Sequence, residues 1–119
     1  MKNLLIGLLA LGSVSAFANC DLSIVGNINS ERLQLVEKIV QDNGYKVTSS
    51  GKSDYTLSVF GYFEKFEGGK CVIVDAQINE VATGHVVHNK HNNTCGIFVA
   101  KNWNHRIKKV IKNLPECKN

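Results

Sequence analysis

Hydrophobic and polar residues alternate along residues 54–66, as in a β-strand that buries one face. Leu57, Val59, Gly61 and Phe63 share one side at a spacing of two, and the segment is rich in aromatic and β-branched residues. The pattern therefore predicts a long strand.

The Gly68-Gly69 pair that follows predicts a two-residue hairpin turn of type I′ or II′, because glycine tolerates the positive φ angles that these turns need. With this turn, the facing pairs are Val59 with Ile78, Gly61 with Ala76, and Phe63 with Val74. The other side of the second strand carries Asp75, Gln77 and Asn79, which suits a sheet with one face in water.

A loop of residues 82–84 ends in glycine and predicts a second hairpin with a bulge. In that register Val81 faces His85, and Cys71 falls opposite Cys95. Facing residues lie about 4.5–5.5 Å apart at Cα, which a disulfide can span. A turn of two residues would instead point Cys95 to the other face.

The flanking segments predict two more strands and a helix. Residues 21–26 form an apolar run that ends in glycine, and residues 45–48 form a short extended segment. Between them, a helix capped at Asn29 or Ser30 ends at Asn43-Gly44. Its apolar stripe consists of Leu33, Val36, Ile39 and Val40.

A second helical period follows Gly96 and ends at Pro115. Its apolar side carries Ala100, Trp103, Ile107, Val110, Ile111 and Leu114. The resulting order, β-α-β-β-β-β-α, predicts a single α+β domain in which two helices pack on one face of a mostly antiparallel sheet.

Residues 1–18 have the three parts of a secretory signal peptide: a basic start at Lys2, a short apolar run, and a cleavage site with small residues ending at Ala18. We therefore expect the mature domain to span residues 19–119 and to be exported, to the periplasm or out of the cell. No stretch approaches the roughly 20 apolar residues of a membrane-spanning helix.

Four cysteines in an exported chain of this length predict two disulfides. Pairing Cys71 with Cys95 leaves Cys20 with Cys117, which would tie the two ends of the domain together. A zinc site is the competing interpretation, but the sequence has no Cys-x-x-Cys pair.

The chain has a formal net charge of +4, and its basic residues are concentrated in the last segment. Lys101, Lys108, Lys109 and Lys112 form a candidate site for an anionic surface, although amphipathic helices ordinarily solvate one face with lysine. The interleaved aromatic residues of a single-strand binder are missing, so no nucleic-acid partner is expected.

Histidines recur at positions 85, 88 and 91, which suggests a metal site. On a strand, however, His88 points away from His85 and His91, and those two lie about 20 Å apart. We therefore expect solvated histidines and no metal or cofactor. The sequence has no Gly-x-Ser-x-Gly elbow, His-Glu-x-x-His pair or phosphate-binding glycine loop, so no catalytic residue is predicted. A small secreted metal-dependent enzyme that uses the strand histidines remains an alternative.

Phe60, Tyr62 and Phe66 share the strand face opposite Phe63, beside Ile73. An aromatic patch on an otherwise polar face is typical of a partner-binding site. The alternative is that another segment of the chain covers these rings.

Several segments occur in an order that resembles small bacterial envelope domains of the TolB N-terminal type. They are the first helix, Gly44-Tyr45-Lys46-Val47, Ser53-Asp54-Tyr55-Thr56-Leu57, the Ala82-Thr83-Gly84 turn and the closing basic helix. The resemblance implies helices paired with a mixed sheet, and the binding of partners in the cell envelope without catalysis. We therefore predict a non-enzymatic binding module with a protein partner. Binding of anionic surfaces through the last helix is a further alternative.

Overall fold

The computed structural model describes residues 20–49 and 53–117, and the predicted signal peptide lies outside them. The elements are β1 (Asp21–Gly26), α1 (Ser30–Asp42), β2 (Lys46–Val47), β3 (Tyr55–Phe66), β4 (Gly69–Glu80), β5 (Val86–Gly96) and α2 (Trp103–Val110). The predicted α+β class and the order of its elements are confirmed.

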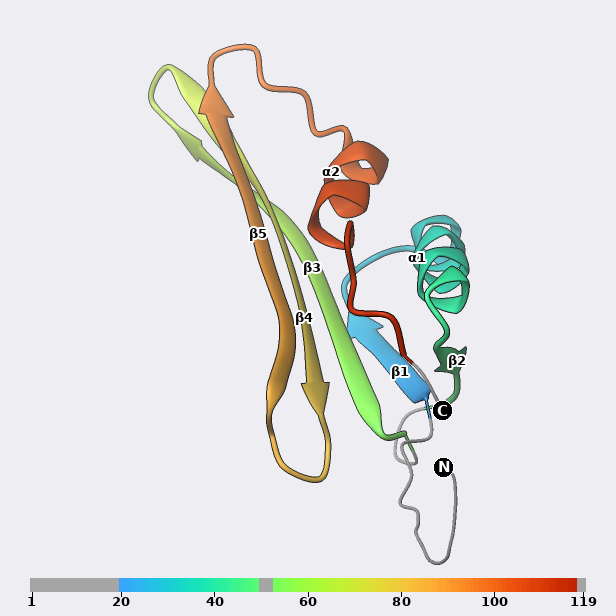
Figure 1. Ribbon diagram of the computed structural model, residues 1–119. Helices are drawn as coiled ribbons and strands as arrows, with labels where there is room; N and C mark the ends of the chain where they lie inside the picture. Colours follow the sequence, from blue (N-terminus) through green and yellow to red (C-terminus); the bar gives the residue numbers. More distant parts are fainter. Residues whose placement is uncertain (1–19, 50–52, 118–119) are drawn as a thin grey trace, which may run out of the picture.

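The described strands form one mixed sheet in the order β2-β1-β3-β4-β5. Strand β1 runs parallel to both β2 and β3, whereas β3, β4 and β5 form two antiparallel hairpins. Figure 1 shows α1 and α2 on the same side of the sheet, with the long hairpins extending beyond α2. In the described part of the chain, neither helix is long and apolar enough to cross a membrane.

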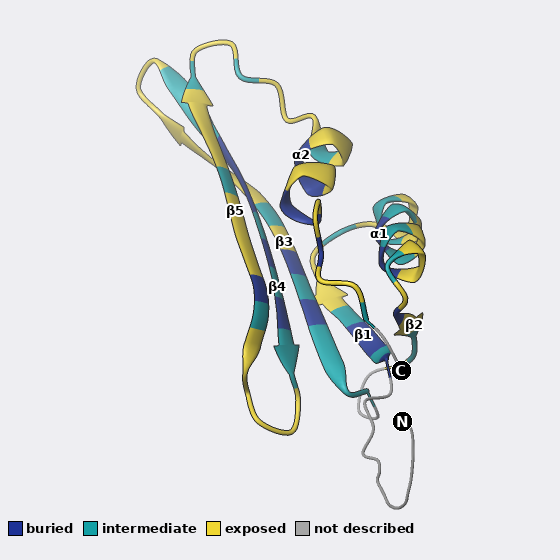
Figure 2. Cartoon of the chain, viewed as in Figure 1, coloured by how far each residue is buried: buried dark blue, intermediate teal, exposed yellow. Residues whose placement is uncertain are grey.

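The core lies between the sheet and the two helices (Figure 2). Its buried side chains are Leu22, Val36, Val40, Tyr45, Leu57, Val59, Val74, Ala76, Ile78, Ile107, Val110, Ile111 and Leu114. The strand residues among them alternate with residues of the opposite face, as a spacing of two requires.

Helix α1 begins and ends as its sequence predicts. The side chain of Asn29 accepts a hydrogen bond from the backbone N–H of Arg32 at 2.9 Å. Gly44 follows the helix with a φ of 92°, a conformation that glycine adopts without steric cost. The extended segment after it is shorter than predicted, because only Lys46–Val47 pairs as a strand.

The predicted register between β3 and β4 was wrong by two residues. The observed facing pairs are Val59 with Ala76, Gly61 with Val74, and Phe63 with Val72. The turn consists of Glu67 and Gly68, of which only Gly68 has a positive φ, so it is neither primed type. Gly69 already pairs with Phe66, and a Cβ there would lie 2.6 Å from the carbonyl oxygen of Gly96. Because the shift is two residues, every side chain keeps its predicted face.

The second hairpin places Cys71 opposite Cys95 as predicted, although its loop differs. Glu80, not Val81, faces His85, and its N–H donates to the His85 carbonyl oxygen at 2.8 Å. The loop is therefore one residue longer than predicted. A register shift beside the loop offsets this residue and restores the pairing of the two cysteines.

Both expected disulfides are present. Cys71 and Cys95 join β4 to β5 with their Cα atoms 3.9 Å apart. Cys20 and Cys117 join the start of β1 to the segment after α2, with Cα atoms 5.9 Å apart and a sequence separation of 97. The first bond braces the hairpins, and the second ties together the two ends of the described domain.

Helix α2 is shorter than the predicted helical period. Ala100, which was expected on the apolar side, is exposed because residues 97–102 form a loop before the helix. Ile111 and Leu114 are buried but follow the helix, where Asn113 has a φ of 60°. The apolar pattern therefore predicted burial correctly at these two positions and helix length incorrectly.

Removing the bond between Cys20 and Cys117 should lower stability considerably, because it closes a long loop in the unfolded chain. In the chain-entropy model, a loop of this size contributes about 4 kcal/mol. We expect the Cys20→Ala/Cys117→Ala double variant to lose roughly this much free energy of unfolding in urea titrations. A loss near zero would show that the other contacts between the two ends already restrict the unfolded chain.

Tyr45 provides a second test of how the chain ends are held. Its hydroxyl donates to the Pro115 carbonyl oxygen at 2.9 Å. Burial is the larger cause of a raised pKa for this hydroxyl, and the neighbouring Tyr55 is the smaller cause. The folded state thus favours the neutral phenol. This stabilisation is complete below the unfolded pKa of about 10 and is lost as the pH rises through the folded pKa.

The Tyr45→Phe variant should therefore lose about 1 kcal/mol near neutral pH, the typical value of one hydrogen bond. Its free energy of unfolding should also fall less steeply above about pH 10 than that of the wild type. Urea titrations across the alkaline range measure both effects. Tyr62→Phe, at an exposed position, is the control and should keep the wild-type slope. Equal slopes for Tyr45→Phe and wild type would contradict the assignment.

Candidate functional site

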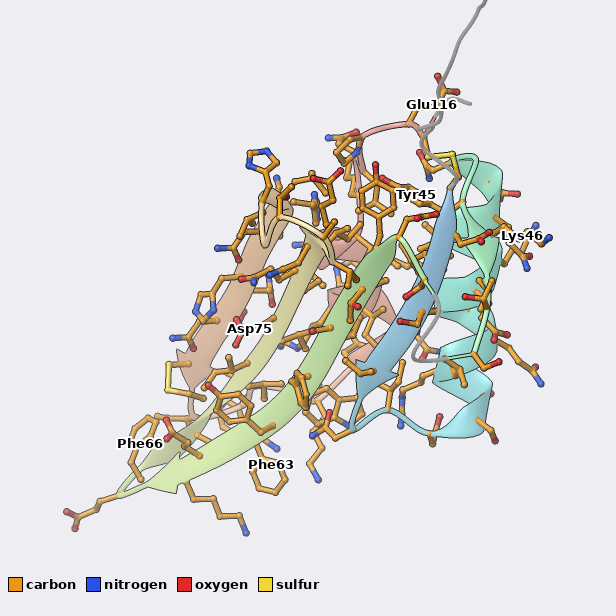
Figure 3. All side chains as sticks on the ribbon, turned by 90° about the horizontal axis from the view of Figure 1, so that it is seen from below. Tyr45, Lys46, Phe63, Phe66, Asp75 and Glu116 are labelled. Atoms are coloured by element: carbon orange, nitrogen blue, oxygen red, sulfur yellow. A yellow bond between two sulfur atoms is a disulfide. The ribbon has the colours of Figure 1, made fainter. Side chains whose placement is uncertain are left out.

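The face of the sheet opposite the helices carries three exposed aromatic side chains, which we call the aromatic patch: Phe60, Tyr62 and Phe66. They alternate along β3 with Val59 and Gly61, which face the helices, so the period of the strand directs their rings to the open face. Figure 3 shows Phe66 and Phe63 at the same end of the sheet, remote from Glu116.

One buried aliphatic side chain lies beside Tyr62 in the aromatic patch. Tyr62 faces Ile73 across the β3–β4 pair, and Ile73 is only 5% exposed. Phe60 and Tyr62 are each 44% exposed and Phe66 is 50% exposed. Tyr62 therefore neighbours Ile73, while all three rings remain about half open to solvent and no described segment buries them.

Polar residues border the aromatic patch on its β5 side. Phe60, Asp75 and His91 form one row across β3, β4 and β5, and Nδ1 of His91 contacts Oδ1 of Asp75. Further along β4, the Gln77 side-chain amide donates to the Asn79 side-chain oxygen at 2.8 Å. The open face thus has an apolar centre and a polar border.

The three histidines predicted from the sequence do not converge. His88 is buried, with Nε2 2.7 Å from the Val110 carbonyl oxygen, so the prediction of a solvated side chain was wrong for this residue. The reason is that α2 covers this face of β5. His91 lies on the opposite face, and His85 lies in the exposed loop before β5. Among the described residues, no three potential metal ligands gather at one place.

The candidate anionic site is divided between two segments. Lys101 lies in the loop before α2, and its Nζ is 4.2 Å from the centre of the Phe63 ring. Lys108 and Lys109 lie in the last turn of α2, and Lys112 follows the helix; all four are exposed. The four lysines therefore do not share one helix.

A cavity of about 140 Å³ lies on the helix side of the sheet. Its lining residues are Asn27, Ile28, Arg32, Gly61, Trp103 and Ile107. The Nε atom of Arg32 is buried without a hydrogen-bond partner. The volume is below the roughly 300 Å³ of an ordinary ligand pocket, and the lining residues supply no acid–base pair.

An exposed apolar pair in the loop between β5 and α2 was not predicted from the sequence. Ile97 is 72% exposed and Phe98 is 96% exposed. The available signal was two adjacent large apolar residues directly after Gly96, where neither the strand period nor the helical period gives both of them a buried position.

Comparison with solved structures finds the same fold in bacterial proteins. The PelC dodecamer from Paraburkholderia phytofirmans matches in two crystal forms. One is 14% identical with a TM-score of 0.53, covering 84% of this chain and 90% of that chain. The other is 13% identical with a TM-score of 0.51, covering 84% and 89%.

TolB from Acinetobacter baumannii is also similar, at 16% identity and a TM-score of 0.46, covering 79% of this chain and 27% of that chain. TolB is thus among the solved structures that this chain loosely resembles. No protein-family model and no curated protein matches the sequence.

The aromatic patch can be separated from the core by its effect on stability. Ile73→Ala removes a buried side chain and should cost about 2 kcal/mol or more of unfolding free energy. Tyr62→Ala and Phe60→Ser remove only cross-strand contacts and should each cost about 1 kcal/mol or less. Urea titrations measure the three values. If the aromatic variants lose as much as Ile73→Ala, the rings belong to the core.

Proposed function

We propose that this chain is an exported, non-enzymatic binding module of the bacterial cell envelope that contacts a protein partner through the aromatic patch. The observation that carries the proposal is that three aromatic side chains, each 44–50% exposed, lie together on a sheet face that no described helix covers. Glu64 lies between Tyr62 and Phe66 on this face, and several exposed aromatic side chains on one sheet face are typical of an interaction site.

The arrangement of the open face suits a small interface. Interfaces commonly have an apolar aromatic centre and a polar rim, and Tyr is among the residues that dominate their binding energy. Tyr62 lies over the buried Ile73, while Asp75 and His91 lie on the border. We therefore assign Tyr62 as the main anchor of the interface.

Two further observations support an envelope location. The two disulfides require an oxidising compartment such as the periplasm or the cell exterior, and the sequence of residues 1–18 has the features of an export signal. The enzyme alternative has less support, because the strand histidines face different directions.

A second copy of this chain is the alternative occupant of the aromatic patch. The PelC structures with the same fold are dodecamers, so the fold is compatible with self-assembly. Light scattering during size-exclusion chromatography distinguishes the two cases, because a self-association through the patch should be lost in Tyr62→Ala.

The experiment that tests the proposal is affinity capture from envelope and secreted fractions of the source cell with the oxidised mature domain as bait. We expect one stoichiometric protein partner that is retained by wild type and weakened about tenfold or more by Tyr62→Ala. Val81→Ala is the matched control, because Val81 is 56% exposed at the opposite end of the β4–β5 hairpin.

Retention of the partner by Tyr62→Ala would refute the assignment of the aromatic patch. Equal loss with Val81→Ala would show a non-specific effect of exposed apolar surface. Turnover of a substrate that depends on added metal would favour the enzyme alternative instead.

A further inference from the structure

The loop between β5 and α2 presents two large apolar side chains to solvent. Phe98 is 96% exposed and Ile97 is 72% exposed, the highest values among the exposed large apolar residues of the described chain. Full exposure of a phenylalanine next to an isoleucine is unfavourable in water, because burial of either side chain would lower the free energy of the system. We call these two residues the apolar apex.

The contacts on either side of the apolar apex hold the loop in this position. Val99 packs on Gly96, where an added Cβ would come within 3.1 Å of the valine methyl group. The buried Arg106 guanidinium donates from Nη2 to the Ala100 carbonyl oxygen at 2.9 Å and from Nε to the Lys101 carbonyl oxygen at 2.7 Å.

Arg106 is itself fixed to β5. Its Nη1 donates to the Asn92 side-chain oxygen at 3.0 Å and to the Thr94 hydroxyl at 2.8 Å. The same strand is braced by the Cys71–Cys95 disulfide just before the loop begins. The loop is thus fastened at both of its ends, and its two apolar side chains are held outward between these attachments.

The loop with the apolar apex lies at the end of the molecule that the β3–β4 turn also occupies, and Figure 1 shows this end away from β2 and from the β4–β5 turn. Lysines border it: Lys65 and Lys70 flank the turn, and Lys101 follows the loop. The Nζ of Lys101 lies 4.2 Å from the centre of the Phe63 ring, so a cation–π contact holds its charge at this end of the sheet. Glu64 and Glu67 reduce the local charge, leaving an excess of lysine.

We propose that the apolar apex docks this protein onto an anionic lipid surface. The shape favours a bilayer over a second protein: two side chains on a protruding loop cannot supply the roughly 1,000 Å² that a stable protein interface buries. A bilayer accepts such residues individually, with aromatic and aliphatic groups at the headgroup boundary and lysines beside anionic headgroups. The apolar apex shares no residue with the aromatic patch, although Phe66 lies beside Gly69 and Gly96 at the same end of the molecule.

The test is co-sedimentation of the oxidised mature domain with vesicles of equal parts phosphatidylethanolamine and phosphatidylglycerol, compared with vesicles of phosphatidylcholine. Wild type should bind the anionic vesicles, and the bound fraction should fall as salt is raised. Phe98→Ser should reduce the partition coefficient about tenfold, and Ile97→Ser by a similar factor. Both positions are exposed, so the variants should keep the wild-type unfolding midpoint.

Val81→Ser is the matched control, since it removes an exposed apolar residue at the opposite end of the hairpins. It should bind vesicles as the wild type does. Lys108→Gln/Lys109→Gln/Lys112→Gln separates the apex from the basic segment at the end of α2. Vesicle binding by this triple variant should still depend on Phe98.

The proposal is overturned if wild type does not bind the anionic vesicles, or if Phe98→Ser binds as well as wild type. Equal loss in Val81→Ser, or loss only in the triple lysine variant, also overturns it. A wild-type dimer that becomes a monomer in Phe98→Ser would show that a second copy occupies the apex instead. Failure here leaves the capture experiment with Tyr62→Ala unaffected, because that variant changes another surface.

Discussion

The antiparallel pairing of β3 with β4 is the interaction on which the rest of this structure depends. It runs from Tyr55 opposite Glu80 to Phe66 opposite Gly69 without interruption. Its helix-facing side carries buried residues on both strands, and β1 and β5 add to its two edges. Both helices then follow from one requirement, which is to cover the apolar face that this pairing creates.

The lengths of the elements explain why one end of the sheet remains uncovered. A strand of twelve residues such as β3 is roughly 40 Å long, whereas α2 with its eight residues is about 12 Å long. Trp103 covers Gly61, and beyond it the Nζ atoms of Lys70 and Lys101 lie over the Phe63 ring, which is 38% exposed. The Cys71–Cys95 disulfide therefore braces the region where the hydrophobic core no longer holds the hairpins together.

The sequence predicted those features that depend on local pattern. The period of two placed each β3 and β4 side chain on its observed face, and Asn29 and Gly44 marked the ends of α1. The register of the first hairpin was wrong because two adjacent glycines offer two possible turns, and only the close approach of Gly96 to Gly69 selects between them. The burial of His88 also depends on tertiary packing, since nothing in β5 indicates that α2 lies over it.

The same distinction applies to the candidate sites. The aromatic patch could be predicted because strand alternation alone decides on which face Phe60, Tyr62 and Phe66 lie. For the apolar apex the sequence offers only a weak signal, two adjacent apolar residues outside both periods. The position of its loop is fixed by Arg106, which hydrogen-bonds to a loop carbonyl and to β5, and these contacts between distant segments cannot be read from the pattern of either element. Phe66 and the apolar apex lie where the hairpins extend beyond Trp103, whereas Phe60 and Tyr62 lie on the open face of the part that α2 covers. The helix-facing side of β3 and β4 therefore supplies the core, and the exposed apolar residues lie on the opposite face and at the uncovered end.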